Sequence, residues 1–418
     1  MKILFIVPYT PTQIRTRPYN LILALARQGH AVTLATLWEN EAERQVLQDL
    51  QKGVVQVISS RLTKMRSIWN SLIALPTRTP LQAVYCWQPG LLHKMNSHLT
   101  QGYDVIHVEH LRGARYGLWA KSRIRSLGLH TPVVWDSVDC ISYLFEQAAR
   151  KSGSLLSRSI SRLELGRTRR YEGWLIEQFD RVLVTSPLDK EAMENLSPRA
   201  KTNGPARCDC PKAIGVLPNG VDLDYFTPPA GARESGTLVL SGKMSYHANV
   251  AAGLYLVNDI MPLIWKDKPD VQLWIAGKDP TPEIRRLAER HPHQVFVTGT
   301  VSDIRPHLRR ATVAVCPIKY GAGIQNKVLE AMATGTPVVT TPQAVSALQV
   351  RSGDDLLVGD SPERFSESVL ALLGSEALRE RMSRAGRRYA EEHHDWNMIV
   401  KRLESVYRQA IALAGDQT

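Results

Sequence analysis

The 418-residue chain has no long hydrophobic run, which excludes one class of protein at the outset. Its first apolar run, ILFIV at residues 3–7, is far shorter than the roughly 20 residues that a membrane-spanning helix needs. We therefore expect no transmembrane helix. The run is also too short for a signal peptide, ends at Pro8 and lacks a small-residue cleavage site, so we interpret it as a buried first strand.

Cysteine is scarce as well. The five cysteines contain no CxxC pair and leave an odd one in any pairing scheme; they are Cys86, Cys140, Cys208, Cys210 and Cys316. A reducing cytoplasm fits this pattern. Cys208 and Cys210 could bind a metal, but no second pair has matching spacing, so we expect no structural zinc.

Acidic residues are under-represented in the first half. Residues 1–213 hold 29 Lys and Arg against 17 Asp and Glu, whereas the remaining residues hold 23 of each. Residues 51–100 have six basic residues and no acidic one, and residues 150–170 have seven basic residues against Glu164 alone. We expect an anionic partner on this side: an anionic membrane surface, a phosphate-bearing acceptor or nucleic acid. Nucleic acid is disfavoured, because no helix-turn-helix, zinc-finger or single-strand-binding pattern is present.

The chain does contain a regular alternation of short apolar strands and amphipathic helices, which predicts an α/β fold with parallel sheets. At roughly 100–200 residues per domain, the length suggests two domains. In the first half we expect helices at residues 19–28 and 158–179, and strands at 3–7, 31–35, 104–108, 132–135 and 181–184. The pattern then restarts with strands at 237–241, 271–276, 295–298, 313–317 and 337–340. The polar stretch 201–212 indicates an exposed loop near a domain boundary.

The stretch from Gly321 to Pro337, GAGIQNKVLEAMATGTP, is the most informative motif. Gly321 and Gly323 lead into a predicted helix that carries Lys327 and Glu330. Glycines allow backbone N–H groups to approach an anion, and the positive N-terminal end of a helix favours negative charge. Glu330, about two turns further along, is suited to accept hydrogen bonds from ribose hydroxyls. The combination predicts a site for a nucleoside-diphosphate donor.

Three other predicted strands in the second half end at glycines, namely Gly242, Gly277 and Gly299. In open α/β sheets ligands bind at the carboxyl ends of strands, although a single glycine there often only forms a turn. Lys243 and Lys278 each follow one of these glycines and could supply positive charge to a diphosphate. The alternative for both lysines is an ordinary solvated surface position.

The order of motifs PNGVDLDYF (218–226), GKD (277–279), VTGTVSD (297–303) and GAGIQNKVLEAMATGTPVV (321–339) resembles the family-four retaining glycosyltransferases of the GT-B fold. It resembles in particular sugar transferases of bacterial exopolysaccharide clusters, including exosortase-associated ones. The resemblance implies two Rossmann-like domains facing a cleft, with an acceptor held by residues 1–213 and a nucleotide-sugar by residues 214–395. Residues 396–418 would form a helix that crosses back to the first domain. The resemblance implies no metal, and the nucleotide-sugar would be a co-substrate rather than a cofactor.

By this resemblance, Lys243 and Lys327 would stabilise the leaving nucleoside diphosphate, since charge stabilisation is usually the largest catalytic contribution. Many members have two glutamates eight positions apart, but here Ala322 occupies the first position and only the second, Glu330, is a glutamate. Near the position where many members have a second basic residue, this chain has His247 or Asn249. The predicted donor-binding residues are Gly242, Gly277, Lys278, Gly299, Thr300, Gly321, Gly323, Ile324, Gln325, Asn326 and Glu330.

In the first domain, residues 9–20 replace the usual glycine pair and place Arg15 and Arg17 where they could contact phosphate; exposed, solvated arginines are the alternative. Asp136 follows a predicted strand where the family often has a histidine. It could bind a sugar hydroxyl or act as a general base, or it could cap the next helix. For Glu109 we favour an acceptor-side role over a structural one.

Residues 61–76, RLTKMRSIWNSLIALP, place Leu62, Met65, Ile68, Trp69 and Leu72 at helical spacing beside a basic cluster. Such a helix could lie in a membrane interface. An ordinary helix packed on the first sheet is favoured, because most globular helices share this periodicity.

Together these patterns predict a cytoplasmic, metal-independent retaining hexosyltransferase that extends a surface polysaccharide or a lipid-linked glycan at the inner face of the membrane. Two alternatives stay open. A GT-B-like sugar-nucleotide epimerase or phosphorylase would turn over the donor without an acceptor, and a non-catalytic scaffold would bind nucleotide without turnover.

Overall fold

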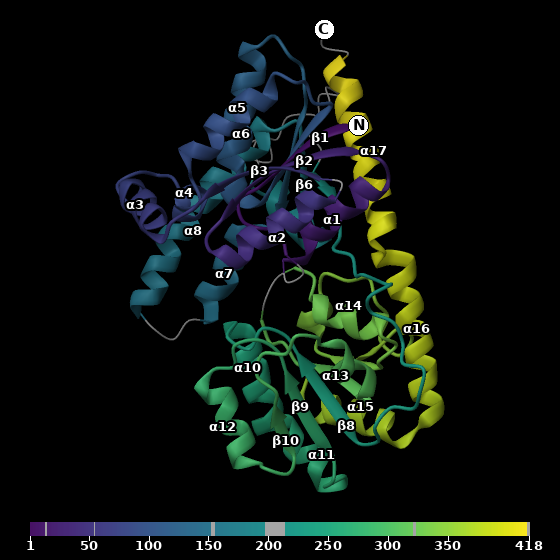
Figure 1. Ribbon diagram of the computed structural model, residues 1–418. Coiled ribbons are helices and arrows are strands. Elements are labelled where there is room, and N and C mark those ends of the chain that lie inside the picture. The colour runs from purple at the N-terminus through teal and green to yellow at the C-terminus, as the bar shows by residue number, and fades with distance from the viewer. Residues whose placement is uncertain (13–14, 54, 152–154, 197–213, 321–322, 416–418) are drawn as a thin grey trace, which may run out of the picture. The chain divides into compact units, whose positions relative to one another are not determined.

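The computed structural model describes residues 1–12, 15–53, 55–151, 155–196, 214–320 and 323–415, with the backbone alone for 148–151 and 155–162 (Figure 1). The chain divides into two compact units. The first comprises Met1–Pro218 together with Trp396–Thr418, and the second comprises Asn219–Asp395.

The first unit is built on a seven-stranded sheet in the order β3-β2-β1-β4-β5-β6-β7, with every neighbouring pair parallel. Its central strands are covered on both faces, which explains why β1 is an almost unbroken apolar run. The strands are β1 (Lys2–Val7), β2 (Ala31–Trp38), β3 (Val55–Arg61), β4 (Val105–Glu109), β5 (Val133–Val138), β6 (Arg181–Val184) and β7 (Ile214–Val216).

Helices pack on both faces of this sheet. They are α1 (Thr16–Arg27), α2 (Glu41–Lys52), α3 (Lys64–Ala74), α4 (Leu81–Tyr85), α5 (Pro89–Leu99), α6 (His110–Ser126), α7 (Ile141–Lys151), α8 (Leu155–Gln178), α9 (Pro187–Glu194) and the last helix of the chain, α17 (Trp396–Gly415). One core contains Trp135 and Phe179, and the other contains Phe5 and Tyr407.

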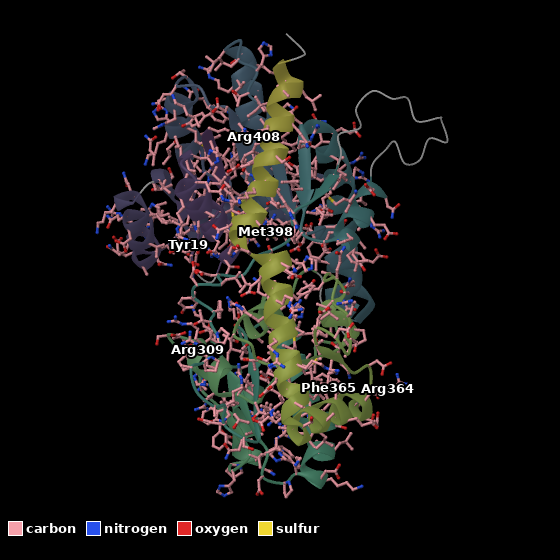
Figure 2. The ribbon with its side chains drawn as sticks, turned by 90° about the vertical axis from the view of Figure 1, so that its right-hand side faces the viewer. Tyr19, Arg309, Arg364, Phe365, Met398 and Arg408 are labelled. Atoms are coloured by element: carbon pink, nitrogen blue, oxygen red, sulfur yellow. The ribbon has the colours of Figure 1, made fainter. Side chains whose placement is uncertain are left out.

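Helix α17 joins the second of these cores through Trp396, Ile399, Leu403 and Tyr407, which recur every three or four residues. Met398 and Arg408 lie on α17 outside this apolar stripe (Figure 2).

The second unit has a six-stranded parallel sheet in the order β10-β9-β8-β11-β12-β13. The strands are β8 (Thr237–Ser241), β9 (Gln272–Ala276), β10 (Val295–Val297), β11 (Val313–Cys316), β12 (Val338–Thr340) and β13 (Leu357–Val358). The α-helices are α10 (His247–Tyr255), α11 (Met261–Asp267), α12 (Pro282–Arg290), α13 (Arg305–Arg310), α14 (Asn326–Ala333), α15 (Pro362–Gly374) and α16 (Glu376–His394). A π-helical turn, η2 (Leu256–Ile260), joins α10 to α11, and a 3₁₀ turn, η3 (Pro342–Val345), follows β12.

Both sheets reverse their strand order once, between β1 and β4 in the first unit and between β8 and β11 in the second. Such switch points leave a crevice at the carboxyl ends of the strands, where α/β proteins bind ligands. The prediction of an α/β chain with two parallel-sheet Rossmann-like domains is confirmed. None of the helices formed by the described residues combines the length and hydropathy needed to cross a bilayer.

One expectation about the first unit is wrong. Residues 61–76 do contain a helix, α3, but it does not pack through its large apolar side chains. Leu62, just before the helix, is buried, whereas Met65, Ile68, Trp69 and Leu72 are exposed.

Candidate functional site

The predicted donor residues of the second unit gather at the carboxyl ends of β8, β9 and β11, beside the switch point. Gly242 and Gly277 follow β8 and β9 with φ of 139° and 151°. A Cβ atom on Gly277 would lie 1.7 Å from the Gly242 carbonyl oxygen, so no larger residue fits there. The packing of these two loops is therefore sufficient to explain why position 277 requires glycine.

Lys327, in the first turn of α14, extends over the Gly242 turn. A Cβ atom on Gly242 would lie 3.4 Å from Lys327 Cε and 3.5 Å from its Nζ. The Lys327 ammonium donates a hydrogen bond to Asn249 Oδ1, and Asn249 Nδ2 donates to the Lys243 carbonyl at 2.9 Å. Partial burial lowers the pKa of Lys327, while Cys316 and Glu330 act in the opposite direction. Asn249 thus fixes a cation at the switch point, where a diphosphate would need one.

Glu330 lies one turn after Lys327 on α14 and is half-buried. Burial raises the pKa of its carboxyl group to about 7, against the opposing effect of Lys327. Within the part of the chain that the structure describes, this carboxylate accepts no hydrogen bond and is available to hydroxyl groups of a ligand.

The other predicted donor residues fall into three groups. Lys243, Lys278 and Thr300 are exposed, and Thr300 Oγ1 accepts a hydrogen bond from the Asp279 amide at 3.3 Å. Gly299 and Gly323 both have φ of 73°, and the space beside Gly299 is open. Around the start of α14, Ile324 is buried, Gln325 is the N-cap residue without a side-chain cap, and Asn326 Oδ1 accepts from Asn219 Nδ2 at 3.3 Å.

Some of the predicted positions lie outside the described residues, namely Gly321, Ala322, Cys208 and Cys210. The other three cysteines, Cys86, Cys140 and Cys316, are free thiols and buried. Across the residues that the structure describes, no three His, Cys, Asp or Glu side chains gather closely enough to hold a metal ion.

In the first unit, Arg17 and Asp136 form a buried ion pair at the carboxyl ends of the strands. Arg17 Nη2 and Nε donate to Asp136 Oδ2 at 2.7 and 3.0 Å, and Nη1 donates to the Pro218 carbonyl at 3.2 Å. Both side chains are almost completely inaccessible. The alternative of an exposed, solvated Arg17 is therefore excluded, and a phosphate could contact this guanidinium only by competing with Asp136.

Asp136 does not cap the following helix. Its Oδ1 accepts from the Val138 amide at 3.2 Å, whereas the Ile141 and Ser142 amides at the start of α7 donate to Glu172 at 2.8 and 3.0 Å. Val138 has φ of 69°, a left-handed conformation rare for a β-branched residue. Strain of this kind, of order 1–3 kcal/mol, is most often found at functional sites. Burial raises the pKa of Asp136, and Arg17 opposes that effect.

Glu109, at the end of β4, is buried beside Asp136. Tyr9 Oη donates to its Oε1 at 2.7 Å, while its Oε2 has no partner among the described residues. Burial and the Asp136 charge raise the pKa of Glu109 to about 8. A carboxyl group with this pKa and a free oxygen can exchange a proton near neutral pH.

His107, in β4, is buried beside Asp136, with its Nε2 3.6 Å from Asp136 Oδ2. Its ring stacks on Phe5 with centroids 4.1 Å apart, and its Nδ1 lies 2.9 Å from Tyr407 Oη of α17. Burial, followed by the nearby Arg17 charge, holds the pKa of His107 well below its usual value.

Arg15 is the accessible arginine of the predicted pair. Its Nη1 donates to the Thr10 carbonyl at 3.2 Å and to Glu43 at 3.4 Å, and its guanidinium lies 4.9 Å from the centre of the Tyr9 ring. The side chain is 41% exposed, so an anion can approach it.

Sequence reasoning missed Tyr9, which donates to Glu109, and Glu172, which accepts the helix amides that Asp136 could have capped. No local signal identifies them, because their partners are 100 and 31 residues away along the chain.

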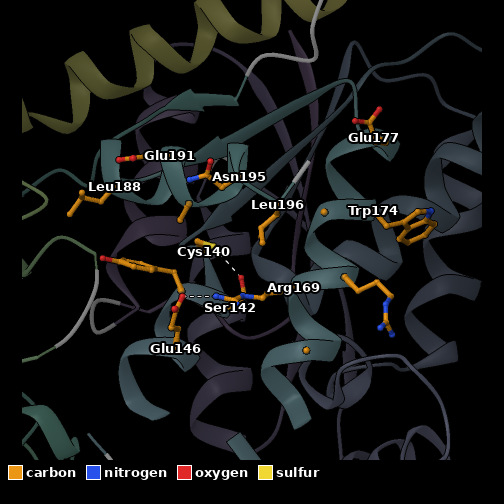
Figure 3. Close-up of a pocket in the computed structure, with 15 residues that line it drawn as sticks. Cys140, Ser142, Glu146, Arg169, Trp174, Glu177, Leu188, Glu191, Asn195 and Leu196 are labelled. Carbon is orange, nitrogen blue, oxygen red and sulfur yellow. Dashed lines mark hydrogen bonds and ion pairs between the residues drawn. The ribbon is translucent and has the colours of Figure 1, made fainter. Parts of the chain in front are cut away.

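The first unit also has a cavity of about 980 Å³ between α7, α8 and α9 (Figure 3). Ser142, Arg169 and Trp174 are among the residues that line it, and none of the predicted site residues does.

Comparison with known proteins agrees with the two-unit architecture. The family model described as "Glycosyl transferase 4-like domain" matches residues 14–202, and the model described as "Glycosyl transferases group 1" matches residues 235–375. One match falls on each sheet, and together they span well over half of the chain.

Two relatives indicate the range of similar sequences. Phosphatidyl-myo-inositol mannosyltransferase of Mycobacterium tuberculosis is 29% identical over 203 residues, which are 46% of this chain and 53% of the relative. The aligned part is thus about half the length of that protein. D-inositol 3-phosphate glycosyltransferase of Xylanimonas cellulosilytica is 25% identical over 413 residues, covering 94% of this chain and 90% of the relative.

Solved structures share the fold at lower identity. Sucrose-phosphate synthase of Thermosynechococcus elongatus has a TM-score of 0.66 at 17% identity, covering 99% of this chain and all of the other. Anabaena HepE in complex with UDP and glucose has a TM-score of 0.67 at 15% identity, covering 97% of this chain and 99% of the other. Each of the two units therefore matches a glycosyltransferase domain family, and the fold of the chain is that of the GT-B glycosyltransferases.

Proposed function

We propose that this protein transfers a hexosyl group from a nucleoside-diphosphate sugar to a glycan or lipid-linked acceptor, with retention of anomeric configuration, in surface or exopolysaccharide synthesis. The observation that carries the proposal is the pairing on α14 of a fixed cation, Lys327, with a half-buried carboxylate, Glu330, at the switch point of the second sheet. The named activities of the relatives, mannosyl and inositol-phosphate glycosyl transfer, support it.

In this proposal Lys327 and Lys243 stabilise the negative charge that develops on the departing nucleoside diphosphate. Asn249 holds the Lys327 ammonium in place before the donor binds. Such preorganised charge costs no rearrangement during the reaction. Glu330 accepts hydrogen bonds from the ribose hydroxyls, and the backbone amides at the start of α14 approach the diphosphate. The proposed reaction uses no metal ion and no cofactor.

We assign Glu109 and Arg15 to binding of the acceptor. Glu109 has a free carboxylate oxygen and a pKa near neutrality, and Arg15 is accessible to a phosphate. The general-base role of Asp136 stays a prediction, since it requires the pair with Arg17 to open.

The proposed acceptor also places the protein at a membrane. The basic excess of residues 1–213 favours contact with an anionic surface, where lipid-linked glycans are held. We propose that the protein works as a peripheral protein at the cytoplasmic face of the cell membrane.

The test of the donor site is saturation-transfer NMR of the purified protein with UDP-glucose, UDP-GlcNAc, GDP-mannose and the free nucleotides, with and without EDTA. We expect one sugar nucleotide to bind selectively, to be insensitive to EDTA, and to bind much more weakly to Glu330→Gln. Glu367→Gln, an exposed glutamate on α15, is the matched control. If Glu330→Gln binds as well as the unaltered protein, the donor assignment fails.

Turnover separates the alternatives. Hexosyl transfer requires an acceptor, and NMR of the product would report an anomeric configuration equal to that of the donor. A sugar-nucleotide epimerase or phosphorylase would convert the donor without acceptor, and a scaffold would bind it without any conversion.

A further inference from the structure

The helix α3 exposes its large side chains rather than burying them. Six apolar residues of this helix and its C-cap are between 48% and 76% exposed, and we refer to them as the apolar face of α3: Met65, Ile68, Trp69, Leu72, Ile73 and Leu75. Scattered single hydrophobic side chains on a surface are ordinary, but a contiguous set on one helix marks an interaction site.

The opposite face of α3 is buried and consists of small or polar residues, Ser67, Asn70 and Ala74. Asn70 Nδ2 donates to the carbonyl oxygens of Tyr85 and Trp87 at 3.3 and 2.8 Å. An amphipathic helix in a water-soluble domain normally buries its apolar stripe and exposes its polar side. Helix α3 has the reverse arrangement, and the hydrogen bonds that Asn70 donates from its polar side hold the helix in this orientation.

The ends of the α3 segment are also fixed to the rest of the first unit. Thr63 Oγ1 caps the helix by accepting from the Arg66 amide at 3.3 Å. After the helix, Arg167 of α8 donates to the Leu75 carbonyl at 2.6 Å and pairs with Glu164, which accepts from the Leu81 amide at 3.0 Å. The apolar face is therefore held outward on a defined support. In Figure 1, α3 lies at the periphery of its unit, outside α4.

The charged residues of the chain segment that contains α3 have one sign. Arg61, Lys64 and Arg78 are exposed, and none of them forms an ion pair among the residues that the structure describes. No acidic residue occurs anywhere in residues 51–100. A second copy of the chain on this face would bring two basic clusters together, which like-charge repulsion opposes. An anionic bilayer provides both the apolar interior and the opposite charge.

We infer that α3 lies in the surface of an anionic lipid bilayer, with its apolar face among the acyl chains and Arg61, Lys64 and Arg78 at the head groups. A helix with Trp, Leu and Ile on one face and basic residues beside them has the character of an interfacial helix. Trp69 suits the boundary region, where tryptophan is enriched. This inference rests on the membrane contact proposed above and specifies the element that makes it.

Flotation of the purified full-length protein with vesicles tests the inference. The vesicles contain either phosphatidylcholine alone or phosphatidylcholine with 30% phosphatidylglycerol. We expect partition into the anionic vesicles, and a decrease of about tenfold or more for the triple variant Ile68→Ser/Trp69→Ser/Leu72→Ser, because interfacial binding scales with the apolar area buried. Lys64→Gln should weaken binding about fivefold at low salt, since each basic residue near an anionic surface contributes by that order.

The matched control is Trp174→Ser/Leu188→Ser, which removes exposed apolar side chains from α8 and α9 of the same unit. It should float like the unaltered protein. All the substituted side chains are exposed, so the variants should fold, and circular dichroism checks this.

Each other outcome overturns the inference and identifies what fails. Equal flotation of the triple variant and the unaltered protein would leave membrane contact in place but remove α3 from it. A dimer that the triple variant converts to a monomer in sedimentation velocity would assign the face to a second copy. No flotation of the unaltered protein would remove the membrane contact itself, while the sugar-nucleotide binding test of Glu330→Gln would still decide the donor site separately.

Discussion

Arg17 contacts a single oxygen of Asp136 with two of its nitrogens, at 2.7 and 3.0 Å, in a place that solvent barely reaches. The same guanidinium donates to the carbonyl of Pro218, the last residue of its unit before the chain enters the second unit. One buried cation thus joins the first turn of α1, the end of β5 and the end of the first segment of the unit.

Removal of one partner of this pair should be costly. Asp136→Asn leaves the Arg17 charge buried without its counterion, and breaking a buried pair costs about 3–5 kcal/mol. We expect a loss of that order in the free energy of unfolding, measured by urea denaturation. Arg15→Ala is the matched control, because its pair with Glu43 is partly exposed and should be worth less than about 1 kcal/mol. Equal losses for the two variants would contradict the assignment of Arg17–Asp136 as the buried anchor.

The raised pKa of Glu109 predicts how the stability of the protein depends on pH. Its pKa is about 8 in the folded protein against 4.5 as a reference, so the folded state binds the proton more tightly than the unfolded state. The contribution of this group to stability is therefore complete below pH 4.5 and is lost as the pH rises to about 8.

Glu109→Gln carries no proton to lose and should remove this contribution to the pH dependence. We compare the free energy of unfolding of the variant with that of the unaltered protein. The difference, variant minus unaltered protein, should increase by on the order of 2–4 kcal/mol between pH 5 and pH 8.5, at about 1.4 kcal/mol per pKa unit. Urea denaturation at a series of pH values measures this. Both proteins contain the other buried carboxyl groups, such as Glu172, so the contributions of those groups to the pH dependence cancel in this comparison. Parallel pH profiles would show that Glu109 is not the group responsible.

Donor binding should depend on pH through Glu330, whose pKa is about 7. The ionised carboxylate accepts stronger hydrogen bonds than the neutral acid, so binding of a sugar nucleotide should strengthen about two- to fivefold between pH 6 and pH 8. Isothermal titration calorimetry with the sugar nucleotide selected by NMR measures it. Glu330→Gln should bind more weakly and without this pH dependence. A variant that keeps the pH dependence would point to another titrating group.

The contact between the Gly242 and Gly277 turns predicts a sharp difference between two glycines. Gly277→Ala would place a methyl group 1.7 Å from a backbone oxygen, so the loops must separate and the second unit should be severely destabilised or fail to fold. Gly299→Ala has a positive φ but open space, and should cost only about 1–2 kcal/mol. Thermal unfolding compares the two. Similar melting temperatures would mean that the two turns do not pack as described.

Much of the fold could be predicted because its signals are local. The strands Arg181–Val184 and Thr237–Ser241 have the predicted bounds, since a strand buried on both faces is a continuous apolar run that turn residues interrupt. Three strands were not predicted, and each carries a weak signal. β3 mixes polar and apolar residues, β7 has three residues, and β13 has two; β7 and β13 lie at the edges of their sheets.

The candidate site was predicted less completely. Residue types and motif order were sufficient to select Lys327 and Glu330, because both lie on one short helix after a glycine turn. They could not show that Asn249, 78 residues earlier, receives the Lys327 hydrogen bond. Nor could they show that Arg17 is buried in an ion pair with Asp136, 119 residues away, rather than exposed.

The sequence by itself determined the class of this protein: alternating apolar strands and amphipathic helices, the glycine-rich turn before α14, and a basic first half. Each depends on residues close together in the chain, which local backbone chemistry and periodicity reveal. Only the tertiary structure decided which side of α3 faces outward and which charges neutralise one another. The periodicity of a helix defines an apolar stripe but not its direction, and contacts such as those of Asn70 with the Tyr85 and Trp87 carbonyls set that direction.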